Sequence, residues 1–81
     1  MSKGITADIV IDVLGYMCPV PLVETKKALR KMQVGQVLEV IGDHSASLVE
    51  IPNSMRENGN EVLAIEKNDG PKWHMFILKK K

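Results

Sequence analysis

The chain has 81 residues, of which 44% are hydrophobic and 26% charged, and its formal net charge is +1. This length predicts one small domain over residues 1–81, with a thin core and little room for a deep pocket. The weak charge gives no overall attraction toward nucleic acid, and no apolar run is long enough to cross a bilayer. The first apolar run is short and carries two aspartates, unlike a secretion signal, so we expect a cytoplasmic protein.

The sequence contains one cysteine, Cys18, and two histidines, His44 and His74. A single cysteine excludes an intrachain disulfide, and a reducing compartment would keep it as a free thiol. This set of side chains gives poor support for a closed tetrahedral metal site. We therefore expect neither a metal nor a bound cofactor.

The first third of the chain changes from a strand pattern to a helix pattern. Apolar residues alternate over residues 9–14, as in an edge or half-covered strand, and Gly15 ends this run. Helical spacing follows over residues 19–32, with a basic flank near its end. The apolar stripe expected to be buried on this helix comprises Leu22, Val23, Ala28, Leu29 and Met32.

The rest of the chain predicts three more strands and a second helix. Residues 36–42, 61–67 and 72–79 are rich in strand-forming residues. A helix is expected to begin near Ser45 or Ser47 and to end at residues 58–60. The three lysines at residues 79–81 are expected to form a frayed tail.

The element order is therefore β-α-β-α-β-β, which indicates an α+β fold. Right-handed crossovers would place both helices on one face of a four-stranded mixed sheet, with the last two strands antiparallel. The result is a two-layer α/β sandwich, whose uncovered sheet face must be partly polar or covered by a partner.

Cys18 lies where the first strand gives way to the first helix, and Pro19 and Pro21 follow it closely. A helix N-terminus stabilises a thiolate, which is the nucleophilic form of cysteine. The two prolines remove amide donors, leaving the Val20 N–H, so we expect the pKa of the thiol to be lowered only modestly. They also stiffen the corner, which suits a thiol presented to a partner protein. The alternative interpretation is a buried cysteine that acts as a small hydrophobic residue.

These residues resemble the TusA/SirA/YedF family of small sulfur-carrier proteins. The family pattern is Leu-Asp-x-x-Gly-x-x-Cys-Pro-x-Pro, and residues 11–21 read IDVLGYMCPVP, with Ile for the usual Leu. The similarity covers residues 8–79. It continues through Lys27, Gly35, Leu38, Asp43, Glu50–Pro52 and Gly59.

The resemblance implies that Cys18 accepts sulfane sulfur as a persulfide and hands it to another protein, with Pro19 and Pro21 shaping its loop. In one branch the donor is a cysteine desulfurase and the sulfur goes toward tRNA thiolation; other branches serve other sulfur metabolism. Val20 stands where the tRNA branch usually has Glu, a departure that concerns the destination of the sulfur rather than the carrier role.

Five further residues are candidates for support or docking. Gly15 is expected to provide a backbone conformation or clearance that a side chain would block. Asp43 and His44 follow the second strand, so parallel pairing of the first two strands would bring them near Cys18. His44 could pair with the thiolate or be a solvated loop residue, and Asp43 could instead cap the next helix. Lys26 and Arg30 share one helix face and could dock an acidic partner or simply be solvated.

The leading interpretation is a sulfur carrier that acts as a cosubstrate with protein partners, and we expect a monomer without direct nucleic-acid binding. The alternative is a regulatory interaction module of the same fold, in which Cys18 has no chemical role. Three aromatic residues are too few for the base-stacking surface of a single-stranded RNA binder. A thiol–disulfide oxidoreductase is disfavoured because the sequence has no second cysteine.

Overall fold

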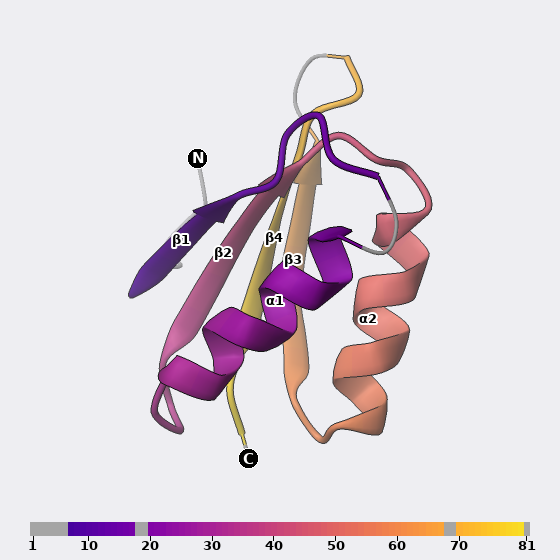
Figure 1. The fold of residues 1–81 in the computed structure, drawn as a ribbon. Coiled ribbons are helices and arrows are strands. Elements are labelled where there is room, and N and C mark those ends of the chain that lie inside the picture. The colour runs from indigo at the N-terminus through magenta and orange to yellow at the C-terminus, as the bar shows by residue number, and fades with distance from the viewer. Residues whose placement is uncertain (1–6, 18–19, 68–69, 81) are drawn as a thin grey trace.

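The computed structural model describes residues 7–17, 20–67 and 70–80. Figure 1 shows a sheet with two helices packed on one of its faces. The predicted β-α-β-α-β-β order and two-layer architecture are therefore confirmed. The elements are β1 (Ile9–Asp12), α1 (Val20–Lys31), β2 (Val37–Gly42), α2 (Ser47–Glu57), β3 (Glu61–Lys67) and β4 (Trp73–Leu78).

The four strands lie in the order β1-β2-β4-β3, so β1 and β3 form the two edges. The strands β1 and β2 are parallel, whereas β4 runs antiparallel to both β2 and β3. The mixed sheet and its antiparallel last pair agree with the sequence prediction. The helices of the described residues are too short and too polar to span a bilayer.

The core lies between the sheet and the two helices. Alternate residues of the two central strands point toward the helices and are fully buried, as the two-residue period of a strand requires. From the helices, the core receives mainly long aliphatic side chains. The fully buried members are Leu38, Val40, Ile51, Met55, Trp73, Met75 and Ile77.

The buried face of α1 differs in part from the predicted stripe. Leu29 and Met32 are buried as expected, but Val23 is 44% exposed. The buried residues at the start of the helix are instead Pro21 and Thr25. Because Thr25 lies four residues after Pro21 and four before Leu29, these three residues share one face, and Val23 points away from it.

The sheet face without helices is partly polar, as predicted. On this face His74 of β4 lies diagonally across from Glu39 of β2, with 2.7 Å between its Nδ1 and the Glu39 Oε2. Both side chains are about one-fifth exposed. His74 is thus a sheet-face residue, as its place in the middle of a predicted strand indicates, and its partner is Glu39.

The expectation of a frayed lysine tail is wrong for Lys79. Its backbone exchanges hydrogen bonds with the loop before β2, from Gly35 N–H to Lys79 O and from Lys79 N–H to Gln36 O. Its ammonium donates to the carbonyls of Leu29 and Met32, at the end of α1. Lys79 is held there because its ammonium donates to carbonyls at the C-terminal end of α1, where helical N–H partners run out.

Candidate functional site

The candidate site is the loop between β1 and α1, which carries the cysteine. Cys18 and Pro19 themselves lie outside the described residues, but the loop is described up to Met17 and again from Val20. Because β1 and β2 are parallel, this loop and the loop after β2 leave the same edge of the sheet. Open α/β sheets favour this carboxyl edge for ligand and reactive sites.

The two loops are joined by a hydrogen bond. The Gly15 N–H donates to the Asp43 Oδ1 at 3.1 Å, across 28 positions of sequence. The prediction that Asp43 would lie beside the cysteine loop is therefore supported, whereas its alternative role as a helix cap is wrong. The residue preceding α2 is Ala46, and no side chain caps that end.

Gly15 is required for its backbone conformation rather than for space. Its φ is +81°, in the left-handed region, and a Cβ there would meet nothing within 4 Å. The Tyr16 N–H donates to the Val13 carbonyl at 3.2 Å, which closes a turn around this glycine. The turn places the Gly15 N–H where Asp43 accepts it, three residues before Cys18.

His44 is half-buried and held at two points. Its Nδ1 lies 3.1 Å from the Ser47 Oγ, and its carbonyl accepts the Trp73 indole N–H at 3.2 Å. Ser47 is the first residue of α2 and is buried. These contacts give His44 a structural role in fixing the second loop, and its proposed pairing with the thiolate concerns an atom outside the described residues.

Trp73 and Gly42 position this edge of the sheet, and the sequence analysis gave neither of them a part in the site. A Cβ on Gly42 would lie 2.7 Å from two carbons of the Trp73 ring and 3.1 Å from the Val13 Cγ2. The indole therefore occupies the space beside Gly42 and anchors the loop through His44. A glycine at the end of a strand gave no signal of this contact, because its partner lies 31 positions later.

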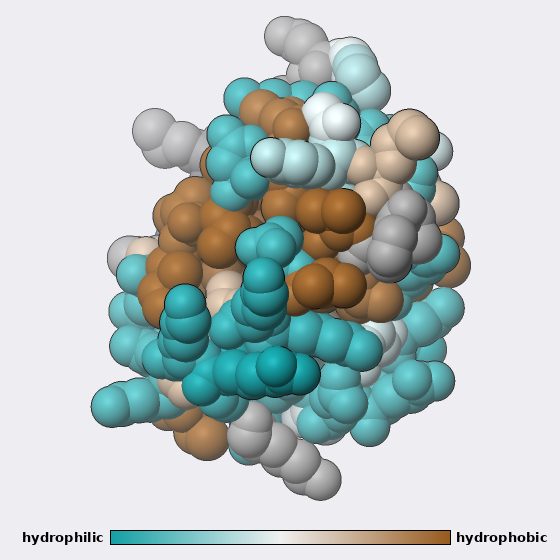
Figure 2. Space-filling view, viewed as in Figure 1, coloured by the Kyte–Doolittle hydropathy of each residue, from teal (hydrophilic) through white to brown (hydrophobic). Residues whose placement is uncertain are grey.

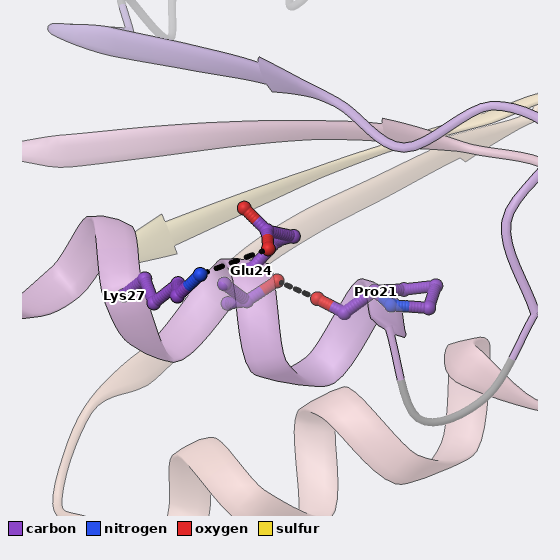
Figure 3. Close-up of polar contacts among 4 residues, drawn as sticks. Pro21, Glu24 and Lys27 are labelled. Atoms are coloured by element: carbon purple, nitrogen blue, oxygen red, sulfur yellow. Dashed lines mark hydrogen bonds and ion pairs between the residues drawn. The ribbon is translucent and has the colours of Figure 1, made fainter.

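The start of α1 is also fixed. The Val20 N–H donates to the Met17 carbonyl at 2.9 Å, and the buried Thr25 hydroxyl donates to the Pro21 carbonyl at 2.7 Å. Figure 3 shows the second bond on the first turns of α1. The amide that the sequence left available to a thiolate therefore already bonds the Met17 carbonyl. The sequence analysis did not predict that Thr25 is buried, because a single polar residue beside an apolar stripe resembles a surface residue.

Exposed apolar side chains directly precede the cysteine in the chain. Leu14, Tyr16 and Met17 are 37%, 54% and 67% exposed. Such a group of exposed apolar residues on a small protein is typical of a surface that contacts another molecule. The residues next to Cys18 are therefore suited to a protein partner.

The predicted basic pair lies on one face of α1. Lys26 and Arg30 are both exposed and line the same hollow of about 340 Å³. Leu29, Lys79 and two asparagines that follow α2, Asn58 and Asn60, complete the lining. No carboxylate lines this hollow, so the face is positive and suits an acidic partner. Among the described residues, no three His, Cys, Asp or Glu side chains gather as metal ligands would.

Comparisons with known proteins agree with this fold and with a functional site at the cysteine loop. The family model described as Sulfurtransferase TusA matches residues 9–79. A candidate sulfur carrier protein from Archaeoglobus fulgidus is 39% identical over 79 residues, covering 98% of this chain and 90% of the relative. The candidate sulfur carrier protein YedF of Escherichia coli (strain K12) is 38% identical over 77 residues, covering 95% of this chain and 99% of YedF.

A solved structure shows the same fold. The SirA-like protein from Desulfitobacterium hafniense superposes with a TM-score of 0.80 at 27% identity, covering 90% of this chain and 99% of that one. The family model spans nearly the whole chain, and two curated relatives exceed one-third identity. The chain therefore belongs to the TusA family of sulfurtransferases, whose curated relatives are described as sulfur carriers.

Proposed function

We propose that Cys18 holds sulfane sulfur as a persulfide and relays it between a donor protein, such as a cysteine desulfurase, and an acceptor protein. The observation that carries this proposal is the position of the only cysteine in the sequence, which lies within the family motif. The described residues on both sides of it are held by hydrogen bonds. The Gly15–Asp43 bond holds one side and the Val20–Met17 bond the other. Exposed flanks held by hydrogen bonds suit exchange between two proteins, because they offer both partners the same fixed surface beside the thiol.

The chemistry needs two successive displacements at sulfur. The Cys18 thiolate attacks the outer sulfur of a donor persulfide; a new S–S bond forms, the donor's S–S bond breaks, and the donor leaves as a thiolate. An acceptor thiolate then attacks the outer sulfur on Cys18, and the Cys18 thiolate leaves. Neither step requires an outside oxidant or reductant. The chain has no second cysteine that could attack the persulfide and release it as sulfide.

The proposed partners are proteins, and a resident cofactor or metal has no part in the mechanism. Lys26 and Arg30 provide a positive face for an acidic partner surface. A monomer in a reducing compartment such as the cytoplasm suits this function, because such a compartment keeps a free thiol from being oxidised to a disulfide between transfers. In one branch of the family the sulfur goes toward tRNA thiolation. Because Val20 stands where that branch usually has Glu, we propose the carrier role and assign no destination to the sulfur.

The test is intact-mass spectrometry of the unreduced protein after incubation with a cysteine desulfurase and cysteine, and in a parallel reaction with thiosulfate. We expect the mass of one added sulfur, removed by reductant and absent from Cys18→Ser. Failure of both donors to load the wild type would contradict the carrier proposal. It would favour the regulatory module, for which Cys18→Ser would retain function.

A further inference from the structure

A groove runs between the edge strand β1 and the helix α1, and it consists of two adjoining hollows. The larger, of about 450 Å³, extends toward the end of α1, and the smaller, of about 270 Å³, lies at its start. Ile11 and Glu24 line both hollows, so the two lie side by side. At its upper end the groove reaches Tyr16 and Val20, each two residues from Cys18.

The groove exists because α1 covers the neighbouring strand better than it covers β1. Ile9 and Ile11 are paired in register with Leu38 and Val40. The two β2 residues are fully buried, whereas the two β1 residues on the same sheet face are only half-buried. Figure 2 shows hydrophobic side chains on this side of the molecule, bordered by hydrophilic ones in the region of α1. The groove therefore has an apolar floor open to a partner.

Charge is distributed unevenly along the groove. Lys27, Arg30 and Lys31 line the larger hollow together with one carboxylate, Glu24. The Glu24 Oε2 lies 3.5 Å from the Lys27 Nζ, and Figure 3 shows Lys27 extended toward it. Asp12 is at the opposite end, in the smaller hollow. The end away from Cys18 is therefore positive, and it complements carboxylates on a partner.

The outer edge of β1 also offers backbone hydrogen bonds. The Val13 N–H, just after β1, donates to the Ile41 carbonyl of β2 at 2.7 Å. Since backbone groups alternate in direction along a paired strand, Ile9 and Ile11 bond toward β2 as Val13 does, and the N–H and C=O groups of Val10 and Asp12 point to the free edge. In the part of the chain that the structure describes, no strand pairs with this edge. An unpaired edge can add a strand from another protein.

We propose that this groove docks an extended, acidic-ended segment of the protein that exchanges sulfur with Cys18. The segment adds to β1 as a further strand, and its apolar side chains cover Ile9, Ile11 and Ala28. Its carboxylates lie at the positive end, beside Arg30 and Lys31. Its other end then reaches the loop that carries Cys18. This inference rests on the proposed function for the identity of the partner, but the docking itself does not require the thiol.

The test uses synthetic eight-residue peptides added to the ¹⁵N-labelled full chain and followed by NMR. Each peptide alternates valine and threonine over five residues and ends in three glutamates or three lysines, placed at either terminus. We expect an acidic peptide to shift the amide signals of Val10, Asp12 and Ala28, and the lysine peptides to bind about tenfold more weakly. Absence of shifts with both acidic peptides, or equal binding by the lysine peptides, would overturn the proposal.

Three variants separate the docking from folding and from sulfur chemistry. Lys27→Glu combined with Lys31→Glu should weaken binding of the acidic peptide about tenfold, whereas Lys72→Glu, exposed just before β4, should not. If Lys72→Glu weakened peptide binding as much as the double variant does, the positive charge that binds the peptide would not be localised at this end of the groove. Cys18→Ser should bind the peptide as the wild type does. Peptide binding without sulfur loading would contradict the carrier function alone, and loading without peptide binding would contradict the docking alone.

Discussion

In the two central strands and in the edge strand β1, alternate side chains face the helices, but these side chains have different functions in the two regions. Leu38 and Val40 of β2 have no exposed surface, because helices cover that part of the sheet. Their register partners on β1, Ile9 and Ile11, are only half-buried, and the loop beyond them exposes apolar side chains. The centre of the sheet therefore supplies stability, and its β1 edge supplies a surface for exchange. Variants in the two regions should affect different measurements.

The largest expected effect is on stability, from a cavity in the centre. Leu38→Ala should lower the free energy of unfolding by about 2–5 kcal/mol, because it removes a fully buried side chain. Ile9→Ala on the edge should lower it by about 1 kcal/mol, since the side chain is half in water already. Urea unfolding measures both changes. Equal losses from the two variants would contradict the distinction between centre and edge.

The next effect concerns the contact between Gly42 and Trp73. Gly42→Ala should lower the free energy of unfolding by about 1–3 kcal/mol, because its Cβ would lie 2.7 Å from the indole ring. Thermal unfolding followed by tryptophan fluorescence measures the loss and reports the displaced indole. A variant as stable as the wild type, with unchanged fluorescence, would show that the ring can move without consequence.

A smaller effect is expected at the bond that joins the two loops. Asp43→Ala should lower the free energy of unfolding by about 0.5–1.5 kcal/mol and speed hydrogen exchange at the Gly15 amide, which loses its acceptor. Asp43→Asn keeps an acceptor oxygen and should restore most of the protection. If Gly15 exchanged at the same rate in all three proteins, the bond would have no part in holding the loop.

The smallest effect on stability is expected from the exposed basic pair. Lys26→Glu combined with Arg30→Glu should change the free energy of unfolding by less than about 0.5 kcal/mol. Loading from a cysteine desulfurase should nevertheless slow about tenfold at low salt, because the partner meets like charge. Loading from a small-molecule persulfide, timed by mass spectrometry, should be unchanged. Equal slowing with both donors would place the effect on the chemistry and not on docking.

The sequence predicted those features that depend on local patterns. Alternation over residues 9–14 indicated a half-covered strand, and β1 has that burial. The parallel pairing of the first two strands predicted that Asp43 would lie near the cysteine loop. The motif around Cys18 indicated the family before any contact was known.

Features that depend on contacts between distant residues were not predictable. The bond between Gly15 and Asp43, and the packing of Trp73 against Gly42, depend on how the loops fold in three dimensions. The buried Thr25 was missed because its hydroxyl is satisfied by a carbonyl four residues earlier, which composition does not reveal. Lys79 was assigned to a tail because a terminal lysine resembles a solvated one until its carbonyl partners are known.

The most direct test of the carrier function is the sulfur load on three proteins treated side by side with a cysteine desulfurase and cysteine. The wild type and folded Leu38→Ala should each gain one reductant-sensitive sulfur by intact mass, and Cys18→Ser should gain none. That result would place the chemistry on Cys18 and show that it does not depend on the packing of Leu38 in the centre of the sheet. Sulfur on Cys18→Ser, or none on the wild type from either the desulfurase or thiosulfate, would contradict the carrier function.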